Sequence, residues 1–174
     1  MKLNSEQKEY LENLYQQYLH DDRVLRMKQV PMHRGSNCYL HSFKVTKKAI
    51  KHALKYRKIS MDDLEVVLLS AILHDYYLYD WRTDRSKRKH HGSRHPLIAS
   101  IQARRDFGVS KRVQKSIRSH MWPIGFTHFP NNREALILSF SDKLVATCES
   151  LTSIKYKKKK EEKYYQYIST LFDD

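Results

Sequence analysis

The sequence AILHDYYLYDWR, at residues 71–82, is an apolar run that ends in two adjacent ionisable residues, His74 and Asp75. Burying such groups is costly unless a hydrogen-bond partner, a counter-charge or a metal ion accompanies them. The first question about this chain is therefore which other groups could meet this pair.

Further histidines and aspartates recur three or four residues from apolar residues inside predicted helices, for example His41 before Val45 and Ala49. This spacing places a side chain on the apolar face of its helix. His95 stands directly before Pro96, where another helix is expected to start. The candidates that face the predicted core are His41, His74, Asp75, His95, His120 and Asp142.

Each candidate by itself has an ordinary explanation, such as a hydrogen-bonded core histidine or a helix cap. Together, four imidazoles and two carboxylates form a donor set that suits Fe, Mn, Ni, Zn or Mg rather than a metal that prefers thiolates. Helix bundles build dinuclear sites from inward side chains on facing helices. The set therefore predicts a metal-binding site.

The elements that must position these ligands are helices. Leu, Ile, Ala and Lys dominate at helical spacing, and the chain has only 4 Gly and 4 Pro, so an all-α fold is expected. The charged segment 82–95 is expected to be an irregular loop. The first predicted helix begins after Ser5, the second runs from about Tyr39 to Tyr56, and the third runs from its cap Ser60 to the His74–Asp75 pair. The fourth runs from Pro96 to near Gly108, and the fifth from its cap Ser110 to before Pro123. The last two cover residues 131–150 and 161–172.

Length and composition point to one domain spanning residues 1–174, with flanking helices at both ends. The polar N-terminus does not read as a signal peptide, and no apolar run reaches membrane-spanning length. Cys38 and Cys148 match no metal or redox spacing. A cytoplasmic location without membrane association is therefore expected.

The formal charge of +14 favours anionic partners and electrostatic steering of an anionic ligand. Because the chain shows no aromatic-basic recognition motif, a nucleic acid is a less favoured partner than a small phosphorylated molecule, including a nucleotide.

The order His41, then HD at 74–75, then Asp142 resembles the HD-domain superfamily of metal-dependent phosphohydrolases. His95 and His120 resemble the extra histidines of its two-metal members. The segments SNCYLHS, LHDYYLYDW, HGSRHP, SHMWP and SDKLVATCE resemble a bacterial subgroup without a well-defined substrate. The similarity covers most of residues 30–150 and implies a single helical HD-domain bundle. HDYY stands here where HDIG is often seen.

The resemblance also implies roles. His41, His74, Asp75 and Asp142 would bind one metal ion, and His95 and His120 a second. Asp75 would bridge the two and act as the catalytic residue that positions a hydroxide for attack on phosphorus.

Four basic residues are candidates for substrate binding. Arg34 lies seven residues before His41, where some HD nucleotidases carry a phosphate-binding arginine. Lys143 follows Asp142, and His91 and Arg94 lie in the basic segment before Pro96. The favoured function is hydrolysis of a small phosphoester or nucleotide. The alternatives are an HD-type di-iron oxygenase, which has the same ligand count, and a metal-stabilised module that binds a nucleotide or nucleic acid.

Overall fold

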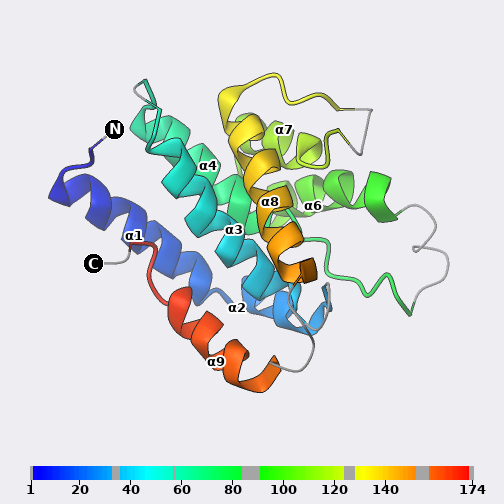
Figure 1. Ribbon diagram of the computed structural model, residues 1–174. Helices are drawn as coiled ribbons and strands as arrows, with labels where there is room; N and C mark the ends of the chain where they lie inside the picture. The colour runs from blue at the N-terminus through cyan, green and yellow to red at the C-terminus, as the bar shows by residue number, and fades with distance from the viewer. Residues whose placement is uncertain are drawn as a thin grey trace.

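The computed structural model describes residues 2–32, 36–56, 58–83, 91–123, 128–151 and 157–172, with side chains from 162 onward in the last range. Within these ranges the chain is all-α, and the only β-type pairing is an isolated bridge between Pro31 and Asn37. The expected fold class is confirmed (Figure 1).

The helices follow one another along the chain as α1 (Ser5–Leu19), α2 (Asp22–Leu25), the 3-10 helix η1 (Arg26–Gln29), α3 (Cys38–Ala53), α4 (Met61–Leu73), α6 (His91–Phe107), α7 (Lys111–Ser119), α8 (Arg133–Leu151) and α9 (Lys157–Tyr167). Helix α3 packs against α4 and α8, while α6 pairs with α7 and α7 reaches both α4 and α8. Helices α1 and α9 lie on the side of the bundle away from α6 and α7 (Figure 1).

Side-chain caps define where several of these helices begin. Asn4 and Ser60 each form a capping box. The side chain of the cap residue accepts a hydrogen bond from the backbone N–H three residues later, and the side chain of that later residue accepts one from the backbone N–H of the cap residue. Asn37 and Ser110 accept from backbone N–H groups at the starts of α3 and α7. The predicted caps Ser60 and Ser110 are thus confirmed.

Helix α4 is the hydrophobic centre of the bundle. It carries eight buried residues among its thirteen, and Leu64, Val67 and Leu68 are fully buried. A helix that is apolar nearly all round has to be enclosed by other helices. Its last turn therefore delivers His74 and Asp75 into the interior, which explains the polar ending of the apolar run.

Helix α6 begins at His91, five residues earlier than predicted, so Pro96 lies inside the helix and not in its first turn. A proline removes one hydrogen bond, to the carbonyl four residues before it. That carbonyl belongs to the exposed Gly92 in the first turn, where the loss is tolerable. The prediction of an irregular loop over 82–95 was therefore wrong for residues 91–95, which are helical. Residues 84–90 lie outside the described residues.

Helix α2 and η1 were not predicted, because both are too short to show a hydrophobic period. α3 and α9 also end earlier than expected, at Ala53 and Tyr167. Among the described residues, no helix is both long and apolar enough to cross a membrane.

Candidate metal centre

All six candidate ligands come together in the interior, although they lie on five different helices or helix ends. His41 lies in the first turn of α3 and His95 in α6, while Asp142 lies midway along α8. His74 and His120 are the C-terminal caps of α4 and α7. Each of the six is at most 7 % exposed.

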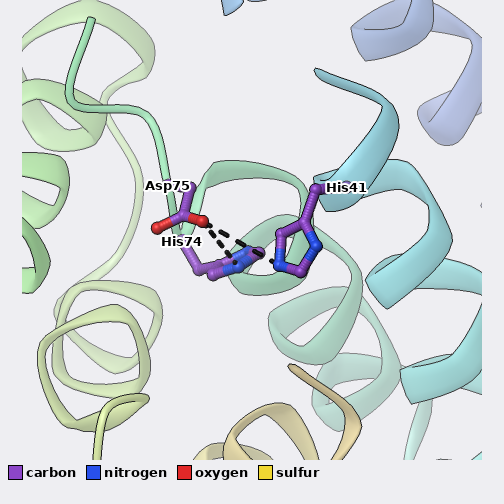
Figure 2. Close-up of side chains that lie close together, drawn as sticks. All are labelled: His41, His74 and Asp75. Atoms are coloured by element: carbon purple, nitrogen blue, oxygen red, sulfur yellow. Dashed lines mark ion pairs between the residues drawn. The ribbon is translucent and has the colours of Figure 1, made fainter. Parts of the chain in front are cut away.

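The first half of the site joins α3, α4 and α8. His41 Nε2 lies 3.1 Å from Asp142 Oδ1 and 3.9 Å from Asp75 Oδ2, and His74 Nε2 lies 3.3 Å from the same Asp75 oxygen. His74 Nε2 is also 3.7 Å from Asp142 Oδ1. Figure 2 shows the rings of His41 and His74 turned toward the Asp75 carboxylate, with both ion pairs dashed.

The second half of the site adds α6 and α7. His95 Nε2 lies 3.3 Å from the other Asp75 oxygen, Oδ1, and His120 Nε2 lies 3.9 Å from it. The two Nε2 atoms are 3.0 Å apart. The Asp75 carboxylate thus turns one oxygen toward each half.

The spacing of these donor atoms fits metal coordination. Metal–ligand bonds of about 2.0 to 2.2 Å place neighbouring donors of one ion about 3 Å apart and opposite donors about 4 Å apart. Three overlapping groups of donors lie within 4.8 Å of one another: His41–His74–Asp75, His74–His120–Asp142 and Asp75–His95–His120. The residues present could hold a metal ion.

Hydrogen bonds on the far side of three rings fix which nitrogen faces the site. The Nδ1 atoms donate to carbonyl oxygens: His74 to Ala71 at 2.8 Å, His120 to Ile117 at 2.7 Å and His95 to His91 at 2.9 Å. The carbonyls of Ala71 and Ile117 lie at the ends of their helices, where the regular helical hydrogen bonds run out. This arrangement aims every Nε2 at the site, as in metal-binding histidines.

Two observations indicate that the site is built for a cation. Buried His74 Nε2 makes no well-aligned hydrogen bond, although it lies 3.3 Å from Asp75 Oδ2. In addition, burial and the neighbouring cationic His74 lower the pKa of His120 to about 3, and burial also lowers the pKa of His95. Both rings are then neutral with the proton on Nδ1, so the 3.0 Å contact brings two Nε2 lone pairs together. A shared metal ion would relieve this repulsion.

In the first half of the site, neighbouring carboxylates raise the pKa values of the histidines instead of lowering them. Burial alone would lower the pKa of His41, but hydrogen bonds to Asp142 and Glu149 outweigh it and raise this pKa to about 9. Burial is outweighed at His74 too, where the Asp75 charge and Asp142 raise the pKa to about 10. The same contacts lower the pKa of Asp75 and Asp142 despite burial. The first half therefore attracts positive charge strongly.

A cavity of about 270 Å³ opens beside the donors, and two of the predicted substrate-binding residues, His91 and Lys143, line it. Lys143 Nζ donates to the His120 carbonyl at 2.7 Å and to Ser139 Oγ at 3.0 Å. His91 stacks on Trp81 with ring centroids 5.0 Å apart. The remaining lining residues, besides donors of the site, are Met32, Tyr77, Trp81, Gly92, Met121 and Ala146.

The other two predicted substrate-binding residues are Arg94 and Arg34. Arg94 is exposed on α6 and is absent from the cavity wall. Arg34 lies outside the described residues. The substrate-binding roles of all four residues stay predictions.

Glu149 is a functional candidate that sequence reasoning missed. Its Oε2 lies 2.8 Å from His41 Nδ1, on the side of the ring away from the site. A signal was present, because Glu149 follows Asp142 by seven residues, two helical turns on the same face of α8.

Metal binding at this site predicts a large thermal shift. An ion present at about 1,000 times its dissociation constant stabilises a protein by about 4 kcal/mol. For a chain of this size, that corresponds to a rise in Tm of roughly 8 to 16 °C on addition of Mn²⁺ or Zn²⁺ to chelator-treated protein. Differential scanning calorimetry measures it, with the exposed His20→Ala as a control that keeps the whole shift. An unchanged Tm would contradict the site.

The fold and the site together define an all-α protein with a buried histidine–aspartate cluster able to hold metal. The family model described as HD domain matches residues 38–147, more than half of the chain. The chain therefore belongs to the HD-domain family, whose members are generally metal-dependent hydrolases. No curated protein and no solved structure gives a significant match.

Proposed function

We propose that this protein is a metal-dependent phosphohydrolase that acts on a small phosphoester or nucleotide and uses two divalent ions. The observation that carries the proposal is the orientation of Asp75, whose Oδ2 and Oδ1 face different pairs of histidines. A carboxylate in this position is suited to bridge two ions. Membership of the HD-domain family supports the same reading.

In this proposal the residues divide into two ligand sets that share Asp75. His41, His74 and Asp142 complete the first set, and His95 and His120 complete the second. When bound, divalent ions lower the pKa of a water molecule and offset charge on phosphoryl oxygens. The protein contributes a buried, preorganised donor set, so little rearrangement is needed when substrate arrives.

The charge of the chain supports an anionic substrate. The formal net charge is +14, and cationic Lys143 lines the cavity beside the donors. A cavity of about 270 Å³ suits a compact molecule. The identity of the ions follows from the donor set only as far as Fe, Mn, Ni, Zn or Mg.

Hydrolysis and oxygenation differ in what they consume, so one experiment separates them. Chelator-treated protein is reconstituted with Mn²⁺ or Fe²⁺ in an anaerobic chamber and assayed for phosphate release across nucleotides and sugar phosphates. We expect release from at least one of them without oxygen, and with Mn²⁺ replacing Fe²⁺. Protein kept in chelator is the control and should release none.

Two results would replace the proposal. Substrate-dependent oxygen uptake without phosphate release would indicate a di-iron oxygenase of the HD type. Metal binding without turnover of any compound, together with tight binding of a nucleotide or nucleic acid, would indicate a metal-stabilised binding module.

A further inference from the structure

We infer that Glu149 is a positioning residue of the metal centre: its carboxylate holds the ring of His41, and Lys44 holds the carboxylate. The inference rests on the proposed function, because it presumes that His41 Nε2 binds an ion. Glu149 itself lies behind the ring and does not face the donors of the site.

His41 differs from the other three histidines in what fixes its ring. Their Nδ1 atoms donate to helix carbonyls, which are neutral acceptors. His41 Nδ1 instead meets the Glu149 carboxylate at 2.8 Å. A carboxylate on the far nitrogen both orients an imidazole and makes it a stronger metal ligand than a carbonyl does.

His41 takes the partner of its Nδ1 atom from another helix. It lies in the first turn of α3. The Asn37 carbonyl, four residues earlier, already accepts from the His41 backbone N–H at 3.1 Å. Helix α8 supplies the partners of both ring nitrogens of His41. Asp142 contacts Nε2 and Glu149 contacts Nδ1, and both residues lie on the same face of α8.

Lys44 holds the Glu149 carboxylate in place. Lys44 Nζ lies 2.9 Å from Glu149 Oε1, and Ser36 Oγ donates to the same oxygen at 3.4 Å. Lys44 Nζ also lies 3.5 Å from the ring centroid of Tyr164 on α9. The contacts thus run from α9 through Lys44 and Glu149 to His41.

Metal titration of Glu149→Ala and Glu149→Gln tests the inference. Loss of such a hydrogen-bonded partner lowers metal affinity by about 10- to 100-fold. We expect a loss of this size for Glu149→Ala, confined to one of the two binding events seen by titration calorimetry with Mn²⁺. Glu149→Gln retains an acceptor for Nδ1 without the charge, so its loss should be smaller. Lys44→Met should resemble Glu149→Gln.

Glu134→Gln is the matched control. Glu134 is a buried glutamate on the same helix, 4 % exposed and paired with Arg112, but it lies at the opposite end of α8. The Glu134→Gln variant should keep the wild-type metal affinity of both binding events, even if its Tm falls. Unchanged metal affinity in folded Glu149→Ala and Glu149→Gln would overturn the positioning role while the proposed function survived. If wild-type protein bound no divalent ion, the proposed function would fail first and the inference with it.

Discussion

Replacing Asp75 by alanine is expected to empty both metal positions and to abolish phosphate release. Its Oδ2 lies 3.3 Å from His74 Nε2, and its Oδ1 lies 3.3 Å from His95 Nε2, so one carboxylate serves both halves of the site. Loss of an outer-shell partner alone costs about 10- to 100-fold, so loss of the shared ligand should cost more than about 100-fold in activity. Metal analysis of the purified variant, with the phosphate assay, measures both effects.

Asp106→Asn is the control for this experiment. Asp106 is an aspartate at the surface end of α6, bonded to Arg105 and to the Tyr76 hydroxyl, and it takes no part in the donor groups. It should keep both ions and full activity. An Asp75→Ala protein that retained two ions per chain would show that Asp75 is not the shared ligand.

Replacing His95 or His120 by alanine is expected to lower the metal content from two ions per chain to one. Both residues face Asp75 Oδ1, whereas His41 and His74 face Oδ2. The first ligand set stays complete, so one ion should remain while activity falls by more than about 100-fold. Metal analysis and the phosphate assay on the same preparation test whether content and activity separate.

His52→Ala serves as the control, because His52 is part-buried on α3 and bonds to Ser141 Oγ at 2.9 Å, outside the donor groups. It should keep two ions and normal turnover. If His95→Ala also kept two ions and normal turnover, the dinuclear assignment would be wrong, and a hydrolase with one ion at the first position would remain.

Local patterns were sufficient to predict which side chains face inward. His41 precedes Val45 and Ala49 at helical spacing, and Asp142 lies amid apolar residues of α8, so their faces follow from the helical period alone. Caps were equally readable, because Ser60 and Ser110 bond to backbone groups only three residues away. The all-α class and the six candidate ligands could therefore be predicted without coordinates.

Features without a local signal could not be predicted. The start of α6 at His91 was missed because Pro96 resembles a first-turn proline, and the helix extends one turn before it. Glu149 was missed because a single carboxylate near a helix end is ordinary in a sequence. What makes it distinctive is a hydrogen bond to a residue 108 positions earlier.

The sequence by itself determined the kind of donors, the helices that carry them and the face on which each donor lies, because these depend on neighbours within a few residues. Only the tertiary structure decided how the donors divide. Asp75 turns its two oxygens to different histidine pairs, and Glu149 meets His41, because α3 and α4 both pack with α8, while α4 also packs with α6 and α7. Contacts between residues so distant in the chain are set by helix packing, which no local pattern encodes.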